Sequence, residues 1–210
     1  MTRRLKDLLK GAFYLLLYAL LLPLAKVLFR VRIRGRELLE RGHGYIAVAR
    51  HRSYWDSPLV AVAFGPKHRV HFIARRGLMK NPLFNPLIRL YATPIDRENF
   101  TRGDFRNMVE SIRREPLVAI FPEGTTRHAT DAKAGAIHFA QLTGKELLPV
   151  NIVATGPYPP RYPFHYPKLT ITIGQPFSVA DLEKQTALCG PRAERYRLLS
   201  ERLMARVDAA

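Results

Sequence analysis

Two residues able to move a proton, His51 and Asp56, lie five positions apart. They belong to segment 50–56, which reads Arg-His-Arg-Ser-Tyr-Trp-Asp and follows the apolar run 45–49. An aspartate bonded to one imidazole nitrogen fixes the tautomer of the ring and leaves the other nitrogen as a base. The pair could therefore take a proton from an alcohol.

The spacing of this pair is not specific. In one continuous helix the two side chains would point about 140° apart, so their contact requires a turn between a strand and a helix. The alternative, which spacing alone favours, is that Asp56 only caps a helix while His51 is a surface loop residue.

Two further segments contain candidate ligands for an oxygen-rich or phosphorylated molecule. Segment 121–127 reads Phe-Pro-Glu-Gly-Thr-Thr-Arg, and segment 94–97 reads Pro-Ile-Asp-Arg. Gly124 permits close backbone approach, and the planar guanidinium groups of Arg97 and Arg127 match a phosphate. The alternatives are an acidic turn with a solvated arginine and a surface ion pair between Asp96 and Arg97. A fourth segment, 148–152, predicts only a strand.

Regular elements must bring these segments together. Apolar or alternating runs predict strands at 45–49, 70–74, 91–95, 117–121, 147–153 and 169–173. Helical patterns cover 58–64, 102–114, 135–143 and 193–206. Alternating strands and helices predict an α/β fold with a central, largely parallel sheet flanked by helices. Because ligands gather at the carboxyl ends of such strands, the segments that follow strands are expected to share one site.

The N-terminus carries an apolar helical segment. Residues 11–25 lack charge, and Lys10 and Lys26 flank them. Fifteen helical residues reach about 22 Å, less than the roughly 30 Å hydrocarbon core, and Pro23 is expected to break or kink the helix. We therefore expect insertion into one leaflet, with a buried core helix, a spanning helix and a signal peptide as alternatives. Residues 1–30 would form this membrane-associating segment, and residues 31–210 the domain that carries the chemistry.

The composition limits the partners. With 34 basic and 17 acidic residues, the formal net charge is +17, which implies an anionic partner. The apolar segment favours a lipid surface, and no nucleic-acid-binding signature is present. Cys189 is the single cysteine and the histidines lack metal-site spacing, so no metal and no cofactor are expected.

The four segments, in their order and spacing, resemble the motifs of the glycerolipid acyltransferase family, and most closely its 1-acylglycerol-3-phosphate O-acyltransferases. These motifs are His-x4-Asp, Ile-Asp-Arg, Phe-Pro-Glu-Gly-Thr and Val/Leu-Pro-Val. The resemblance extends over 31–182 and includes Lys-Ala-Gly-Ala at 133–136 and Ile-Gly-Gln-Pro at 173–176. This chain departs from the family in having Arg50 where asparagine is usual, and Thr126 places Arg127 one residue late.

The resemblance implies transfer of a fatty acyl chain from acyl-CoA or acyl carrier protein to the sn-2 hydroxyl of 1-acylglycerol-3-phosphate. The product would be phosphatidic acid, made at the cytoplasmic face of the inner membrane. His51 would be the base and Asp56 its orienting partner, and the acceptor would be held by Arg97, Glu123, Gly124, Thr125 and Arg127. Alternatives are another lysophospholipid or a lyso-ornithine lipid as the acceptor, a non-catalytic basic membrane-surface protein, and a nucleic-acid-binding protein.

Overall fold

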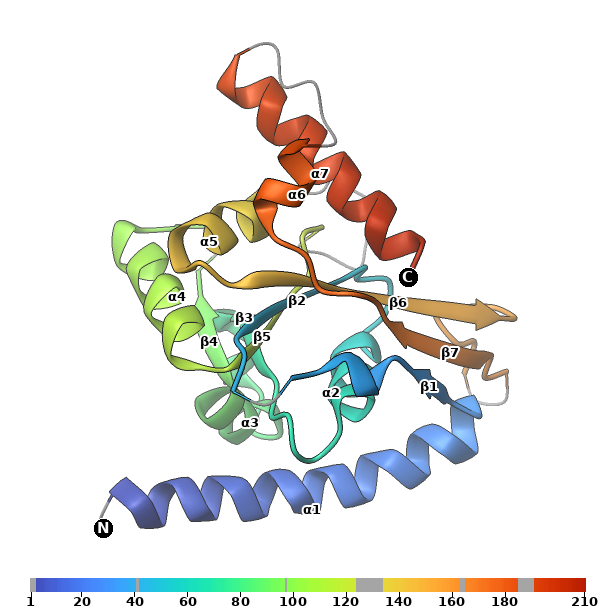
Figure 1. Cartoon of the computed structure of the whole chain (residues 1–210). Coiled ribbons are helices and arrows are strands. Elements are labelled where there is room, and N and C mark those ends of the chain that lie inside the picture. Colours follow the sequence, from blue (N-terminus) through green and yellow to red (C-terminus); the bar gives the residue numbers. More distant parts are fainter. Residues whose placement is uncertain (1–2, 41, 97, 124–133, 163–164, 185–190) are drawn as a thin grey trace.

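The computed structural model describes residues 3–40, 42–96, 98–123, 134–162, 165–184 and 191–210. These residues form a seven-stranded sheet with helices on both faces (Figure 1). In their order across the sheet, the strands are β1 (Arg32–Arg34), β7 (Lys168–Ile173), β6 (Glu146–Thr155), β2 (Tyr45–Ala49), β5 (Leu117–Ile120), β3 (His71–Arg75) and β4 (Ala92–Ile95). Only β6 and β7 pair antiparallel among these strands. The predicted α/β class with a largely parallel central sheet is confirmed.

The helices are α1 (Arg3–Phe29), α2 (Asp56–Phe64), α3 (Phe84–Tyr91), α4 (Arg102–Arg114), α5 (Gly135–Thr143), α6 (Val179–Lys184) and α7 (Arg192–Asp208). The 3-10 turns η1 (Arg36–Leu38) and η2 (Arg76–Lys80) are shorter. The sequence pattern misses β1, α3 and α6, and it wrongly assigns Tyr91 to a strand. Ile88 and Tyr91 are buried three residues apart, the spacing of one helix face, so packing of α3 decides the conformation there.

Two apolar cores lie on the two faces of the sheet. On one face, the alternate residues Tyr45, Ala47 and Ala49 of β2 pack with α2 and with the end of α1. On the other face, Val48 packs with α4, α5 and α7. Every residue of β2 and β5 is buried, as expected of strands covered on both sides. Helices α1 and α4 therefore belong to opposite layers of the molecule.

Helix α1 differs from the prediction. It is 27 residues long and contains Pro23 in its interior, so the chain does not break at that residue (Figure 1). The missing hydrogen bond at an interior proline costs about 3 kcal/mol. Ala25 and Phe29, which follow Pro23, are buried in the core, and this packing offsets the cost. The part from Asp7 to Phe29 is long and apolar enough to cross a membrane, so the argument from a short segment is wrong.

One side of α1 is docked along the domain. The Tyr91 hydroxyl donates a hydrogen bond to the Lys10 carbonyl at 2.6 Å. Tyr14 is buried and its hydroxyl accepts from the Val70 amide at 3.3 Å. Near the other end, the Phe29 ring meets the Trp55 ring edge-on at 5.1 Å. The opposite side of α1 exposes a leucine-rich stripe made of Leu5, Leu8, Leu9, Leu15, Leu16, Leu20, Leu24 and Val27.

Candidate active site

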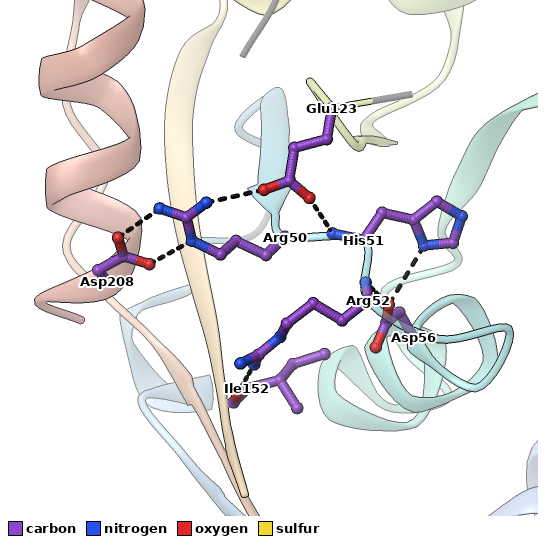
Figure 2. A network of polar contacts seen from close by, with 7 residues as sticks. All are labelled: Arg50, His51, Arg52, Asp56, Glu123, Ile152 and Asp208. Carbon is purple, nitrogen blue, oxygen red and sulfur yellow. Dashed lines mark hydrogen bonds and ion pairs between the residues drawn. The ribbon is translucent and has the colours of Figure 1, made fainter. Parts of the chain in front are cut away.

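The first motif lies where the sequence predicts it, between the carboxyl end of β2 and the start of α2. His51 is two residues beyond Ala49, and Asp56 is the first residue of α2. Asp56 Oδ2 accepts the backbone N–H groups of Arg52 at 2.6 Å and Ser53 at 2.7 Å, and it lies 3.2 Å from His51 Nδ1 (Figure 2). The turn therefore brings the two predicted residues into contact, and Asp56 also shapes the loop between them.

The second oxygen of Asp56 is held by a residue that the sequence did not single out. Tyr158, which follows β6, donates its hydroxyl hydrogen to Asp56 Oδ1. Burial, together with the charge of Asp56, raises the pKa of the Tyr158 hydroxyl, so it remains a donor at every relevant pH. Asp56 is fully buried, with both oxygens fixed by donors. Its orientation toward the imidazole is thus set from two sides.

The His51 ring is held in one plane and remains reachable. It stacks on the Phe121 ring at a centroid distance of 4.3 Å and an interplanar angle of 19°. Its side chain is 18% exposed. Figure 2 shows the second ring nitrogen pointing away from Asp56, and within the described residues this Nε2 has no hydrogen-bond partner. An oriented imidazole with one free nitrogen can act as a general base.

Glu123 links the third motif to the first. Its Oε2 accepts the His51 backbone N–H at 2.8 Å, and its Oε1 accepts from Arg50 Nη1 at 2.7 Å (Figure 2). Glu123 follows β5, the strand next to β2, and is only 6% exposed. A nearly buried carboxylate that accepts a charge-assisted hydrogen bond is strongly oriented. Both oxygens of Glu123 are therefore engaged within the loop that carries the histidine.

Arg50 extends this network to the last helix. Its Nε and Nη2 donate to the two carboxylate oxygens of Asp208, each at 2.6 Å, in a two-pronged pair. The hydrogen bonds that Arg50 donates to Asp208 and then to Glu123 raise the pKa of its guanidinium, which stays charged. Arg50 in turn lowers the pKa of Asp208. The C-terminal end of α7 is thereby tied to the loop that contains His51 (Figure 2).

Several predicted site residues cannot be placed. Arg97, Gly124, Thr125 and Arg127 lie outside the described residues. Asp96, beside Arg97, accepts the backbone N–H groups of two following residues through Oδ1, at 3.0 and 3.1 Å. The fourth motif lies within β6, the other neighbour of β2. Among the described residues, no group of three or more His, Cys, Asp or Glu side chains is placed to hold a metal ion.

Known proteins resemble this chain in sequence and in fold. A family model described as Acyltransferase matches residues 30–153. The 1-acyl-sn-glycerol-3-phosphate acyltransferase of Streptococcus pneumoniae (strain ATCC BAA-255 / R6) is 32% identical over 142 residues, which are 67% of this chain. The match spans about half of that relative, 52% of its length.

A second relative is covered more fully. The protein of the same name from Bacillus subtilis (strain 168) is 26% identical over 179 residues, 84% of this chain and 86% of the relative. The crystal structure of the 1-acyl-sn-glycerophosphate (LPA) acyltransferase PlsC from Thermotoga maritima superposes with a TM-score of 0.62. It is 25% identical, and the superposition covers 85% of this chain and 71% of that chain. The motifs, the sheet and these matches agree: the chain belongs to the Acyltransferase family.

Proposed function

We propose that this acyltransferase moves a fatty acyl chain from an acyl thioester to the sn-2 hydroxyl of 1-acylglycerol-3-phosphate, giving phosphatidic acid. The observation that carries the proposal is the contact between His51 and a fully buried Asp56 at the carboxyl end of β2. The names of the two relatives support the choice of acceptor. The chemistry requires one positioned base, and the site provides one.

The proposed reaction needs no covalent acyl-enzyme. His51 Nε2 takes the proton of the acceptor hydroxyl as its oxygen attacks the thioester carbonyl. The tetrahedral intermediate then collapses, the carbon–sulfur bond breaks, and the leaving thiolate takes the proton from the imidazolium. The products are an ester and a free thiol. Asp56 stabilises the transient positive charge on His51 and keeps Nδ1 protonated.

The acceptor is proposed to bind beside this base. By the family resemblance, Arg97, Gly124, Thr125 and Arg127 would hold its phosphate and glycerol. Glu123 has a different part in this scheme, because a carboxylate repels a phosphate and both its oxygens are already engaged. We assign it to positioning the backbone of His51.

We further propose that residues 1–30 anchor the domain formed by 31–210 with α1 lying in the plane of the membrane. Contacts from Lys10 to Phe29 bind one side of the helix to the domain, so a spanning helix would have to lose them or carry the domain into the lipid. The leucine-rich stripe on the other side is free to enter one leaflet. Because the proposed donors, acyl-CoA or acyl carrier protein, are made in the cytosol, we assign the site to the cytoplasmic face.

The test is an acceptor panel. Purified chain on vesicles is given 1-acylglycerol-3-phosphate, lysophospholipids with other headgroups, or a lyso-ornithine lipid, each with acyl-CoA or acyl carrier protein, and products are identified by mass spectrometry. We expect phosphatidic acid as the main product, formed at least about 10²-fold more slowly by the His51→Ala variant. If a product with another headgroup formed faster than phosphatidic acid, the assignment of 1-acylglycerol-3-phosphate as the acceptor would be overturned. Absence of product from every pair would overturn catalysis and leave a non-catalytic membrane-surface protein.

A further inference from the structure

A groove lies on the outer side of α4, away from the catalytic motifs. Its volume is about 730 Å³, and it is lined along α4 and bordered by Leu142 of α5. The floor is apolar and includes Phe100, Phe105 and Val109. Phe100 and Leu142 are 49% and 40% exposed, so this floor is open to solvent. This concave surface gathers apolar side chains at one place, where a bound partner can cover them.

Arginines border this apolar floor. Arg102, Arg106 and Arg113 line the groove, and Glu110 is the acidic residue among its lining. Spacings of four and seven residues place the three arginines along one side of α4. They extend over eleven residues, about 16 Å or three helical turns. Arg113 donates to the Leu142 carbonyl at 3.2 Å, whereas Arg102 and Arg106 have no ion pair or hydrogen bond within the described part of the chain.

The groove and the end of α1 belong to different layers of the molecule. Helix α4 packs on the sheet face opposite to the one covered by α2 and the end of α1. In Figure 1, α1 runs along the bottom of the molecule and α4 lies above it at one side, and only the C-terminal end of α4 approaches α1, where Lys10 and Glu115 lie 3.7 Å apart. With the leucine-rich stripe of α1 on a membrane, most of α4 would therefore lie clear of the lipid. A partner for this groove would therefore be a soluble molecule with acidic and apolar groups.

One end of the groove is close to the catalytic edge of the sheet. Strand β4 ends at Ile95 and α4 begins at Arg102, so the first turns of α4 lie at the carboxyl edge where His51 is found. Three strand spacings separate β4 from β2, in the order β2-β5-β3-β4. At about 4.8 Å per spacing, this is about 14 Å. A flexible arm attached to a partner bound in the groove could therefore extend to His51.

We propose that the groove docks an acidic amphipathic helix of the acyl carrier protein that delivers the thioester; this rests on the proposed function. Apolar residues of the helix would cover the floor, and its carboxylates would pair with Arg102, Arg106 and Arg113. The net charge of +17 would steer such a partner toward the chain. Coenzyme A carries phosphates as well, but it would not use the apolar floor between the arginines.

The experiment compares two donors with the same acyl chain and 1-acylglycerol-3-phosphate as the acceptor. The test variant is Arg102→Glu/Arg106→Glu in the full chain on vesicles. The control, Arg197→Glu/Arg202→Glu, makes the same charge change on the exposed side of α7. We expect the test variant to raise KM for the acyl carrier protein about tenfold or more with little change in kcat, and to change KM for acyl-CoA less than about twofold. The control should leave both KM values near those of the parent.

Retained turnover with acyl-CoA shows that the test variant is folded. An equal loss with both donors would overturn the docking proposal, as would an unchanged KM for the carrier protein or a parent enzyme that uses acyl-CoA alone. The last result leaves the proposed function intact. The anisotropy of fluorescently labelled carrier protein measures docking without turnover. If the carrier protein bound but no product formed, the proposed function would be overturned and the docking proposal would stand. Binding of single-stranded RNA but not of carrier protein would assign the groove to nucleic acid.

Discussion

The contacts of Arg50 predict that its two carboxylate partners, Asp208 and Glu123, contribute unequally to stability and to turnover. Asp208 is 48% exposed and Arg50 35%, so their pair is largely solvated. Exposed ion pairs contribute about 0–1 kcal/mol. We therefore expect Asp208→Ala to lower the free energy of unfolding by about 1 kcal/mol at most and to leave turnover within a few-fold of the parent.

Replacing Arg50 itself should cost more. Glu123 is 6% exposed, and Arg50→Ala removes a charge-assisted hydrogen bond from it. Hydrogen bonds to charged groups contribute about 1.5–3 kcal/mol. Because Glu123 also accepts the His51 backbone N–H, turnover should fall roughly tenfold, the equivalent of about 1.4 kcal/mol. Arg50→Lys, which keeps the charge but cannot bind two oxygens side by side, should lie between the parent and Arg50→Ala.

The assay is urea unfolding in detergent micelles, followed by tryptophan fluorescence, together with kcat measured on vesicles. The double variant of Arg50 and Asp208 completes a cycle and should show a coupling energy of about 1 kcal/mol or less. If Asp208→Ala destabilised the chain as much as Arg50→Ala, the Glu123 contact would not be the dominant one. If Arg50→Ala lowered stability but not kcat, Glu123 would have no part in positioning His51.

Three other predictions concern the base, the buried histidine and the membrane helix. His51→Ala should reduce kcat by at least about 10², without loss of stability in the same unfolding assay; activity like that of the parent would refute the mechanism. Burial lowers the pKa of His71 to about 4, so between pH 6.5 and 4 the unfolded chain binds a proton that the folded chain does not. The free energy of unfolding should therefore fall by about 2 kcal/mol as the pH is lowered from 7 to 5. The His71→Gln variant should lack this fall, and equal pH dependence of the parent and the variant would contradict the prediction. In a chain without Cys189, single cysteines at Lys10 and Lys26 should be labelled from the same side of sealed vesicles, whereas labelling from opposite sides would establish a spanning helix.

Local pattern alone predicts much of the fold, whereas the central pair of the site is selected by the resemblance to the acyltransferase motifs. A parallel strand that is buried on both faces appears in the sequence as a continuous apolar run. For this reason the strand predicted at 45–49 coincides with the observed β2, Tyr45–Ala49. The contact between His51 and Asp56 does not follow from spacing alone, which favours a helix cap at Asp56 and a surface His51; the family motif indicates the contact that the structure shows. The two residues are close in the chain, and a strand followed by a helix leaves them on one short turn.

Only the tertiary structure identifies the residues that hold this pair in place. Tyr158 is 102 positions from Asp56, and Asp208 is 158 positions from Arg50. No local pattern encodes such contacts, because they depend on how β6 and α7 return to the carboxyl edge of β2. The continuation of α1 through Pro23 has a similar origin: local propensity predicts a break or a kink there, and burial of the residues beyond it keeps the helix continuous.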